Sequence, residues 1–508
     1  MTTSTNPSEP TPVTEVDAAP SEVGERLEGP RVPVDDRLLE RLRSVCAEVT
    51  ADDSARVEAG RDWWPLAIRW AMGGTVPALP AVVARPGDAA QVAAVLAACH
   101  EGRVPVTAMA GRSGVCGSSV PAFGGVALDM CALAGVEAVD NESLLVDVRP
   151  GTFGPDLEHT LQGQGVTVGH WPQSMDLSTV GGWLACRGAG QYSTRYGKIE
   201  DMVAGLEVAL ADGRVIRTGG VGPRSATGPD LTQLFVGSEG VLGVITRAVL
   251  KLHPLAPSQG RGAWSFSSFG AGLEACRRIL RRGATPAVLR LYDEVESARN
   301  FDVSEGHALI VLDEADPGLL DATMAVVDAE CGRAGASALD DALVGRWLGH
   351  RNDVSALAPL YRAGIVVDTI EIAAPWSRLT ALYERCVGAL RAVPGTLAAS
   401  AHQSHAYGDG ACLYFTFAGQ PTNGDIDDAW AERYYDTAWS TVMEAVIEGG
   451  GTISHHHGVG VNRARFMAAA LGEGLEVLRS VKEALDPRGI LNPGKLGLPS
   501  PFGELGWP

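Results

Sequence analysis

The chain has 508 residues, of which 45% are apolar and 20% are charged, and its formal net charge is −20. This length is too great for one hydrophobic core, so two or three domains are expected, and the acidic total argues against a nucleic-acid binder, whose phosphate contacts need clustered Lys and Arg. The nine cysteines include no C-x-x-C pair, which argues against a disulfide framework or a zinc site and favours a reducing, cytoplasmic compartment.

The first residues, MTTSTNPSEPTPVTEVDAAPSEV, have neither a basic start nor an apolar stretch. Residues 1–30 are therefore interpreted as a disordered tail and not as a signal peptide. Helical periodicity begins near Asp35 and runs to about Val49, inside an N-terminal helical segment of residues 31–75. No apolar run reaches the roughly eighteen residues of a membrane span, so we expect none.

Residues 80–117 predict a strand, a helix and a second strand that runs into a loop of small residues. AVVA is the first strand, Asp88 can cap the helix, and VPVTAMA is the second strand. One face of the helix carries apolar residues at helical spacing, namely Val92, Val95, Leu96 and Cys99.

The loop GRSGVCG that follows has neither the G-x-G-x-x-G spacing of a Rossmann motif nor the GK[ST] of a Walker A loop. Its small residues let backbone N–H groups approach a diphosphate closely. A tight turn without a ligand is the alternative interpretation.

Two further stretches are rich in Gly, Ser and Thr, residues 166–220 and residues 228–254. Within the first, EVALADGRVIRT predicts two strands around an Asp-Gly turn. Within the second, a glycine recurs every three residues before the strand VITRAVLKL, at Gly237, Gly240 and Gly243. Three such loops docked on strands suggest one extended ligand held at several points, and a dinucleotide fits this better than a single phosphate.

From about Ala256 to Glu448 the pattern changes to Arg-rich helices such as CRRILRRG and strands such as HALIVLDE, which predict a second α+β domain. Within it, Leu413-Tyr414-Phe415 reads as a strand, so Tyr414 points opposite to its two apolar neighbours. The remaining residues contain three adjacent histidines in TISHHHGVG, then a helix broken by Pro487 and a Pro-Gly turn.

These loops, in this order, resemble the flavoproteins of the vanillyl-alcohol oxidase type, as does DPRGILNPGK at residues 486–495. The resemblance spans roughly residues 60–497. It implies an α+β fold with a two-subdomain FAD-binding domain at residues 76–255 and an α+β cap domain at residues 256–448. Residues 449–508 would carry the histidines and return to the FAD-binding domain.

Within that superfamily, GHWPQSMDLSTVGGW, RYGKIEDMV, GPDLTQLFVGSEGVLGVIT, ACLYFTF and SHHHGVG resemble the alkyl-dihydroxyacetonephosphate (alkylglycerone-phosphate) synthases. These enzymes exchange the acyl chain of acyl-dihydroxyacetonephosphate for a long-chain alcohol, with FAD but without net redox. SHHHGVG discriminates best, because the related D-2-hydroxyacid dehydrogenases usually have a Glu-His pair at this place. The implied function is a transferase of ether-lipid biosynthesis.

The resemblance implies that four stretches bind FAD without a covalent link. They are Ala108, Met109, Ala110, Gly111, Arg112, Ser113 and Gly114; Gln173, Ser174, Met175, Asp176, Leu177, Ser178 and Thr179; Cys186, Arg187, Gly188 and Ala189; and Ser238, Glu239, Gly240, Val241, Leu242, Gly243 and Val244. Cys116 invites a covalent interpretation, since berberine-bridge-type enzymes have a loop His in a similar place, but we interpret it as a small buried filler.

The resemblance also implies roles in catalysis. His170 and Thr179 would lie near the flavin ring, Tyr414 would be the proton donor and acceptor, and Arg290 would help to hold the substrate. The active site would also be lined by His455, His456 and His457. A tyrosine, with an ordinary pKa near 10, can serve as a base only if neighbouring positive charge lowers its pKa, and the imidazoles and Arg290 could do so.

The sequence departs from the synthases in two places. They carry a substrate arginine nineteen residues before the Trp of their APW motif, and the position at that spacing from Trp376 is Leu357 here. Arg351 and Arg362 flank it as candidate substitutes. The third aromatic residue of their YFYF run is Thr416.

In an extended segment side chains alternate, so His455 and His457 are expected to face the flavin and substrate, with His456 behind them. Three such residues do not easily chelate one metal, and no metal is expected. HAYGDG with these histidines superficially resembles the metal site of the D-2-hydroxyacid dehydrogenases, but the Glu of those sites is missing. His402 and His405 are therefore interpreted as hydrogen-bonded polar residues, and a polar loop with chance histidines stays open as an alternative.

Two rival functions stay open as well. The first is an FAD-dependent oxidoreductase acting on a D-2-hydroxyacid or an alcohol, and the second is a flavin-binding protein without catalysis. The expected partners are a small-molecule or lipid substrate and at most a peripheral contact with a membrane. No nucleic acid is expected, and a homodimer is left open.

Overall fold

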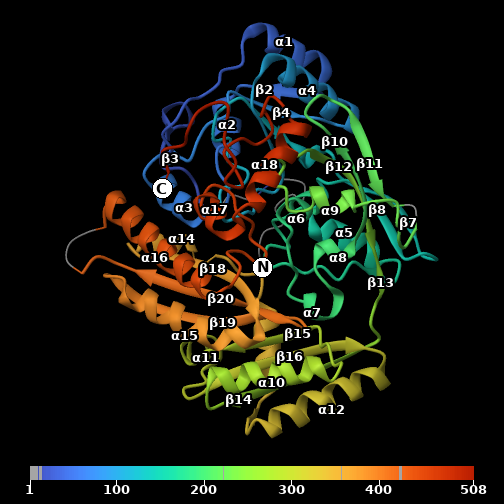
Figure 1. Ribbon diagram of the computed structural model, residues 1–508, viewed down its shortest axis with the longest axis vertical. Coiled ribbons are helices and arrows are strands. Elements are labelled where there is room, and N and C mark those ends of the chain that lie inside the picture. Colours follow the sequence, from blue (N-terminus) through green and yellow to red (C-terminus); the bar gives the residue numbers. More distant parts are fainter. Residues whose placement is uncertain (1–9, 11–13, 221, 356, 423–425, 508) are drawn as a thin grey trace.

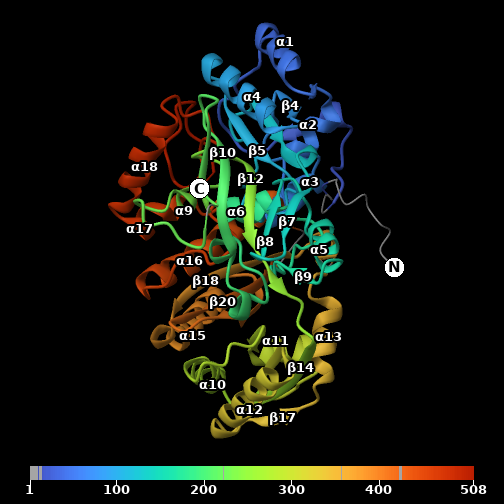
Figure 2. The same cartoon turned by 90° about the vertical axis from the view of Figure 1, so that its right-hand side faces the viewer.

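The computed structural model describes residues 10, 14–220, 222–355, 357–422 and 426–507. In Figure 1 the chain forms the blue elements of the upper part, then the green sheet on the right, and then the yellow and orange sheet at the bottom. Its red C-terminal elements then return to the upper part, beside the blue and green elements, as the turned view of Figure 2 also shows.

A four-stranded sheet forms the first part of the chain, with strand order β2-β4-β6-β5. Its elements are β2 (Glu48–Thr50), β4 (Val82–Arg85), α4 (Ala89–Gly102), β5 (Val106–Met109) and β6 (Val126–Asp129). The predicted cap of α4 is confirmed, because the Asp88 carboxylate accepts a hydrogen bond from the backbone N–H of Gln91 at 2.8 Å. The predicted apolar face is confirmed as well, by the full burial of Val92, Val95, Leu96 and Cys99.

The N-terminal region is more ordered than the sequence suggested. It forms β1 (Gly24–Glu25), α1 (Asp36–Val45), α2 (Asp53–Ala59), α3 (Pro65–Met72) and β3 (Thr75–Val76), with a 3₁₀ turn at Pro20–Glu22. The interpretation of residues 1–30 as a disordered tail is wrong from residue 14 onward, because β1 pairs with β3 and Leu27 packs in the core beside Trp64. Residues 1–9 and 11–13 of that expected tail lie outside the described residues.

Helix α1 also ends earlier than the predicted Val49. Cys46 takes an extended conformation directly after the helix, and residues 48–50 then pair with β4 as the edge strand β2. The tertiary pairing of this short segment outweighs its helical periodicity.

An antiparallel five-stranded sheet follows, with strand order β11-β10-β12-β8-β7. Its strands are β7 (Val136–Asp140), β8 (Leu145–Val148), β10 (Val203–Ala209), β11 (Val215–Gly219) and β12 (Val244–Lys251). The hairpin predicted around the Asp-Gly turn is confirmed as β10 and β11. The shorter elements around this sheet are α5 (Gly154–Gln162), β9 (Val166–Thr167), α6 (Val180–Cys186), α7 (Ser193–Tyr196), α8 (Ile199–Met202), α9 (Leu231–Phe235) and β13 (His253–Pro254).

The largest sheet has seven antiparallel strands in the order β17-β14-β16-β15-β19-β20-β18. Its strands are β14 (Ser258–Phe266), β15 (Val288–Tyr292), β16 (His307–Ala315), β17 (Ser337–Leu339), β18 (Val366–Pro375), β19 (Thr396–Ala406) and β20 (Gly410–Gly419). The helices are α10 (Phe269–Arg281), α11 (Glu294–Phe301), α12 (Pro317–Arg333), α13 (Ala342–His350), α14 (Leu357–Arg362), α15 (Trp376–Ala392) and α16 (Asp428–Glu448). Neighbouring helices α10, α12, α15 and α16 cover one face of this sheet.

The opposite face of the seven-stranded sheet is turned towards the first part of the chain. The predicted alternation along β20 is confirmed, because Leu413 and Phe415 are fully buried while Tyr414 is partly accessible. Strand register then places Tyr414 beside His402 of β19 on one side and Glu371 of β18 on the other. Tyr292 of β15 pairs with His402. Four residues from four strands therefore form one row across this face.

The C-terminal residues return to the first sheet after a 3₁₀ turn at Ala464–Phe466, α17 (Met467–Leu471) and α18 (Gly474–Leu485). Leu491 bridges Val106 in parallel, and the Lys482 ammonium donates to the backbone carbonyl of Val241 at 2.8 Å. Among the described residues, every helix is too short or too polar to cross a membrane. The prediction of an α+β fold is confirmed.

Candidate active site

A cavity of about 430 Å³ lies between the loops of the first part and the open face of the seven-stranded sheet. Most of the predicted FAD-binding residues line it. They are Ala108, Met109, Ala110, Gly111, Arg112, Ser113, Gly114, Gln173, Ser174, Leu177, Ser178, Thr179, Cys186, Gly188, Ala189, Ser238, Glu239, Gly240, Gly243 and Val244. From the predicted catalytic set, the lining residues are His170, Arg290, Tyr414, His456 and His457.

Six residues of the predicted sets do not line the cavity, although each is adjacent in sequence to residues that do. Three have apolar side chains buried in the protein, Met175, Val241 and Leu242. Asp176 is exposed, and the Arg187 guanidinium lies 3.3 Å from the Glu200 carboxylate. His455 points away from the cavity, as described below.

Each of three cavity loops contains one non-glycine residue in the left-handed region of backbone space. These are Arg112, Arg187 and Glu239, with φ of 52°, 58° and 49°. Such turns aim successive backbone N–H groups into a shared concavity, which suits an anion. The repetition of this feature in three loops around one cavity fits an extended ligand with charged and polar groups.

Gly111 is needed for a different reason from the one expected. A Cβ atom added there would lie 2.1 Å from the backbone carbonyl oxygen of Leu177. The glycine therefore lets the first cavity loop pack directly on the second, and any side chain at this position would push the two loops apart.

His170 is a buried polar side chain at the cavity. Its side chain is fully buried, and neither ring nitrogen has a hydrogen-bond partner among the described residues. Burial lowers the pKa of His170 to about 3, so the ring is neutral and presents one N–H and one lone pair. Buried polar groups are normally satisfied, and a flavin with polar ring atoms fits this site.

Cys116 lies behind the first loop and does not line the cavity. Burial raises the pKa of its thiol, and its carbonyl oxygen accepts hydrogen bonds from the backbone of Val461 and Asn462 at 2.9 and 3.1 Å. This environment agrees with a buried filler and not with a flavin attachment point.

Tyr414 faces the cavity at the centre of the row across the sheet. Its ring stacks on the ring of His402 at 4.9 Å between centroids, and its hydroxyl oxygen accepts a hydrogen bond from Thr369 at 3.0 Å. Burial raises the pKa of Tyr414. The expectation that neighbouring charge would lower this pKa is therefore wrong, because the nearby imidazoles are neutral.

Arg290 points into the cavity with two of its donors occupied. Its Nε donates to the hydroxyl of Tyr292 at 3.1 Å, and its Nη2 donates to Nε2 of His402 at 2.8 Å. Since a guanidinium can only donate, His402 must carry its proton on Nδ1 and donate to Glu296 at 2.7 Å. Among the described residues, no carboxylate forms an ion pair with Arg290, so its charge is available to an anionic ligand.

The three adjacent histidines are held by one carboxylate, that of Glu371. It accepts hydrogen bonds from the backbone N–H groups of His455, His456 and His457, and from the hydroxyl of Ser454 at 3.0 Å. It also forms an ion pair with Arg463 at 2.7 Å, with both side chains fully buried. Burial is the largest single influence on the pKa of Glu371 and acts to raise it, but Arg463 and the three neighbouring histidines together outweigh it, so the pKa is lowered.

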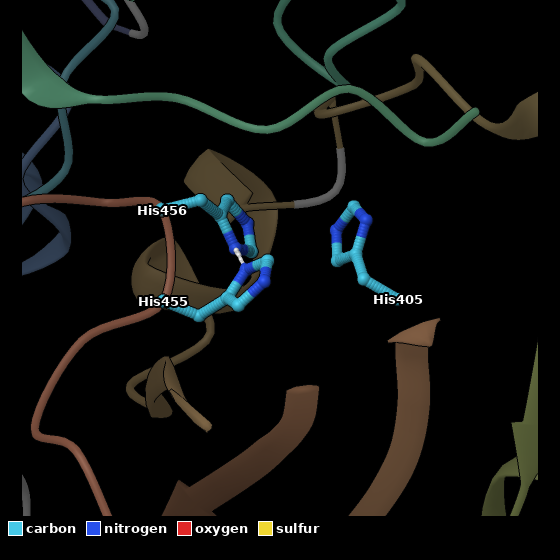
Figure 3. Close-up of side chains that lie close together, drawn as sticks. All are labelled: His405, His455 and His456. Carbon is cyan, nitrogen blue, oxygen red and sulfur yellow. Dashed lines mark hydrogen bonds between the residues drawn. The ribbon is translucent and has the colours of Figure 1, made fainter. Parts of the chain in front are cut away.

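This anchoring changes the orientation of the histidines. The backbone curls around Glu371 instead of running extended, so the expected alternation is wrong: His456 and His457 line the cavity, while His455 lies behind them. The Nδ1 atoms of His455 and His456 are 2.9 Å apart and hydrogen-bonded (Figure 3). His405 faces this pair, with its ring stacked on His455 at 4.9 Å between centroids.

Two groups of side chains at the histidine cluster are close enough together to be candidate metal sites. Ligand atoms of His405, His455 and His456 lie within 4.8 Å of one another, and so do those of Glu371, Cys412 and His456. Burial lowers the pKa of His455 and His456 to about 3 and that of His457 to about 4. The three rings are therefore neutral at physiological pH.

A second buried carboxylate, Glu239 of the third cavity loop, holds the residues after the histidines. It accepts hydrogen bonds from the backbone N–H groups of Val459 at 2.5 Å and Gly460 at 2.9 Å. A Cβ atom at Gly458 would lie 2.3 Å from its Oε1 atom. The segment SHHHGVG is thus fixed to the seven-stranded sheet by Glu371 and to the FAD-binding loops by Glu239.

The two arginines that flank Leu357 differ in position. Arg362 is exposed and donates to the hydroxyl of Thr14 at 3.3 Å, away from the cavity. Arg351 lies near the cavity, where its guanidinium stacks near the rings of Trp171, Tyr192 and Trp347 and donates to Gln191 at 3.2 Å. Leu357 and Gln191 both line the cavity.

The sequence interpretation missed Glu371, Thr369 and Arg463. The interpretation of His402 and His405 as hydrogen-bonded polar residues is confirmed. The one sequence signal for Glu371 was a charged residue between two isoleucines in an apolar strand, VVDTIEIAAP. Such a residue is normally paired, but the sequence did not indicate with what.

We predict that Glu371→Gln lowers the free energy of unfolding by about 3–5 kcal/mol, because it leaves Arg463 buried without its partner. Denaturant unfolding of the purified protein measures this. Glu274→Gln is the matched control: its partly exposed ion pair with Arg277 is expected to contribute less than about 1 kcal/mol. Equal, small losses in both variants would contradict the anchoring role of Glu371.

The neutral histidines also predict a pH dependence of stability. Below about pH 6.5 a histidine gains a proton in the unfolded chain, whereas folded His456, with a pKa of about 3, does not. The unfolded state then binds more protons, so stability falls as the pH is lowered, by about 1.4 kcal/mol per pH unit for each such histidine near pH 5. His456→Gln should remove that contribution from denaturation curves measured between about pH 7 and pH 5. An unchanged slope would show that His456 is not a buried neutral group.

Comparison with known proteins gives the family. Residues 80–219 match the family model described as FAD binding domain, and residues 257–496 match FAD linked oxidases, C-terminal domain. The chain is 30% identical over 443 residues to a protein of Escherichia coli strain K12 named as the uncharacterized FAD-linked oxidoreductase YgcU, covering 83% of this chain and 90% of that protein. It is 29% identical over 462 residues to the alkyldihydroxyacetonephosphate synthase of Dictyostelium discoideum, covering 83% and 74%.

Solved structures agree in fold. An alkyldihydroxyacetonephosphate synthase superposes with a TM-score of 0.76 at 24% identity, over 96% of this chain and 89% of the other. p-Cresol methylhydroxylase superposes with a TM-score of 0.75 at 17% identity, over 93% and 99%. The predicted two-part FAD-binding architecture and the predicted FAD cofactor are confirmed by these matches. The chain belongs to the FAD-linked oxidase family and has the FAD-binding fold of the vanillyl-alcohol oxidase type.

Proposed function

We propose that the protein is an FAD-dependent enzyme of the alkylglycerone-phosphate synthase kind, which exchanges the acyl group of acyl-dihydroxyacetonephosphate for a fatty alcohol. The observation that carries this proposal is the position of Tyr414. Its phenol lies in the cavity that is lined by the predicted FAD-binding residues, stacked on His402 and near the rings of His456 and His457, at 6.1 and 5.5 Å between centroids.

The reaction needs acid–base groups and a site for an anion. A C–H bond beside the ketone is loosened, the ester C–O bond breaks, and an ether C–O bond forms as the alcohol loses its proton. The products are the ether and a fatty carboxylate with one proton. The enolate character that develops beside the ketone needs nearby donors or cations.

Tyr414 is suited to donate a hydrogen bond or a proton in this step. Because its oxygen already accepts a hydrogen bond from Thr369, its own O–H is free to point to an acceptor in the cavity. The raised pKa keeps the phenol protonated. Neutral His456 and His457 offer lone pairs to a leaving proton, and groups positioned in this way typically contribute about 10²–10⁴ in rate.

Arg290 and Arg351 are suited to hold the phosphate of the substrate. Both lie near the indole of Trp347, whose ring centroid is 5.5 Å from the Arg290 guanidinium carbon and 5.8 Å from that of Arg351. Among the described residues, neither guanidinium forms an ion pair with a carboxylate. Arg351 takes the place of the arginine that the synthases have at the position of Leu357.

Bound FAD would supply the isoalloxazine ring that takes part in the chemistry beside the substrate. The residues that would hold it are those of the four cavity stretches, with His170 against the ring. We propose that the flavin is bound without a covalent link, and the position of Cys116 behind the cavity loop supports this.

A second candidate is an oxidoreductase acting on a D-2-hydroxyacid. The same arginines could hold a carboxylate, and a relative at 30% identity is named as an FAD-linked oxidoreductase. In that reaction the substrate would lose its hydroxyl proton and the hydrogen of its α-carbon, and bound FAD would supply the acceptor for the two electrons.

The two candidates are separated by incubating the FAD-loaded protein with acyl-dihydroxyacetonephosphate and an isotope-labelled fatty alcohol, without an electron acceptor. Mass analysis should find the label in an ether product. Tyr414→Phe should fold and bind FAD normally and form this product at a rate lower by about 10²-fold or more. If no ether product forms and a D-2-hydroxyacid bleaches the flavin band, the synthase proposal is wrong and the oxidoreductase is the function.

Arg351→Ala is expected to raise KM for the phosphate-bearing substrate by about 10-fold or more, because a charge-assisted bond contributes about 1.5–3 kcal/mol. Turnover of bound substrate should change less. Arg362→Ala is the control, since Arg362 contacts Thr14 outside the cavity, and its KM should stay at the wild-type value. Equal KM values for both variants would remove Arg351 from the substrate site.

A further inference from the structure

A continuous chain of hydrogen bonds runs behind the cavity wall through five side chains. Nδ1 of His405 lies 2.9 Å from the hydroxyl oxygen of Ser193, which lies 3.0 Å from that of Tyr407. The Tyr407 hydroxyl lies 3.0 Å from Nε2 of His455, and Nδ1 of His455 lies 2.9 Å from Nδ1 of His456. Residues from α7, β19, the turn after β19 and the histidine segment meet in this chain.

The two end residues of this hydrogen-bond chain line the cavity, whereas its three middle residues do not. His405 and His456 both line the cavity, but Ser193, Tyr407 and His455 do not. In Figure 3 His405 projects from one side, opposite the hydrogen-bonded pair of His455 and His456. Two cavity-lining imidazoles are thus connected through the protein.

The donors and acceptors of this chain can be assigned without conflict in two ways. In the first, protons point from His405 through Ser193 and Tyr407 to Nε2 of His455, and Nδ1 of His455 donates to His456. In the second, every hydrogen bond is reversed. Hydroxyl groups both donate and accept, and a neutral imidazole does each at one nitrogen, so both assignments satisfy all five groups. The two differ by the movement of one proton across each link.

We propose that His456, His455, Tyr407, Ser193 and His405 form a proton relay, which takes the hydroxyl proton of the substrate at one end and returns a proton to the cavity at the other. This deepens the proposed function. The alcohol proton passes to Nε2 of His456 as the alcohol oxygen bonds to carbon, one proton shifts along each link, and Nε2 of His405 gives a proton to the departing carboxylate. Charge and atoms balance, and no redox partner is needed.

The alternative use of these histidines is a metal site, and the hydrogen bonds argue against it. Two nitrogens bound to one tetrahedral zinc ion at about 2.0–2.1 Å would lie about 3.3 Å apart, whereas the Nδ1 atoms of His455 and His456 are at hydrogen-bond distance. Nδ1 of His405 and Nε2 of His455 are also engaged by hydroxyl groups. Both ring nitrogens of His455 are therefore engaged in hydrogen bonds, which leaves this residue no nitrogen for a metal ion.

Tyr407→Phe tests the relay, because it removes one link and keeps the ring. We expect kcat to fall by about 10²-fold, with KM and FAD content unchanged. The rate in mixtures of light and heavy water should report several moving protons in the wild type and fewer in the variant. Ser193→Ala should have the same effect, and the double variant should be no slower than either single variant, because a chain broken once is already broken.

Tyr434→Phe is the matched control, since its hydroxyl bonds only Thr396 in the described residues, at 3.0 Å, and its kcat should equal that of the wild type. Wild-type kcat in Tyr407→Phe would overturn the relay. So would losses that multiply in the double variant, or a stoichiometric divalent metal that disappears in His405→Ala.

The test remains valid if the proposed function fails. An oxidised D-2-hydroxyacid also loses a hydroxyl proton, so the same variants can be compared with that substrate. If neither substrate turns over, nitrogen-15 NMR of labelled histidine side chains measures the chain directly. Tyr407→Phe should shift the ring nitrogens of both His455 and His456, and a shift at His455 alone would overturn the coupling between them.

Discussion

The active site depends on the buried carboxylate of Glu371. A carboxylate without water must be paired and hydrogen-bonded, and here its partners are Arg463 and the backbone of three successive histidines. These bonds fix the path of the histidine segment, and the path decides which rings face the cavity. On the opposite side of the cavity, the carboxylate of Glu239 accepts hydrogen bonds from the backbone of Val459 and Gly460, which follow the histidines. Two acidic residues, one from each side of the cavity, therefore hold one short segment between the FAD-binding loops and the seven-stranded sheet.

The strand register of the seven-stranded sheet places the other polar side chains of the candidate site next to one another. Tyr292, His402, Tyr414 and Glu371 stand side by side on four neighbouring strands, and stacking joins the first three rings. Burial raises the pKa of Tyr414 and lowers that of His402, so both rings are neutral, and the guanidinium of Arg290 lies beside them as a cation. A neutral, hydrogen-bonded wall with a free cation suits an anionic substrate whose reacting part must exchange protons.

Local patterns in the sequence predicted local structure well. The cap at Asp88, the hairpin at the Asp-Gly turn and the direction of Tyr414, opposite to that of Leu413 and Phe415, all follow from rules that act over a few residues. The Gly-rich loops indicated the cavity. Contacts between distant segments were out of reach. Neither the pairing of β18 with β20 nor the buried bond from Glu371 to Arg463 leaves a periodic signal. For that reason the strand-like alternation predicted for the histidines is wrong, and so is the predicted tail from residue 14 onward.

The proposed function requires one cavity that holds FAD beside Tyr414 and the anchored histidines. A crystal structure of the FAD-loaded protein with a bound phosphate-bearing substrate analogue measures this most directly. We expect the flavin ring to lie between His170 and Tyr414. The analogue should lie beside His456 and His457, and its phosphate should contact Arg290 and Arg351. A flavin ring outside this cavity, or an analogue whose phosphate contacts neither arginine, would contradict it.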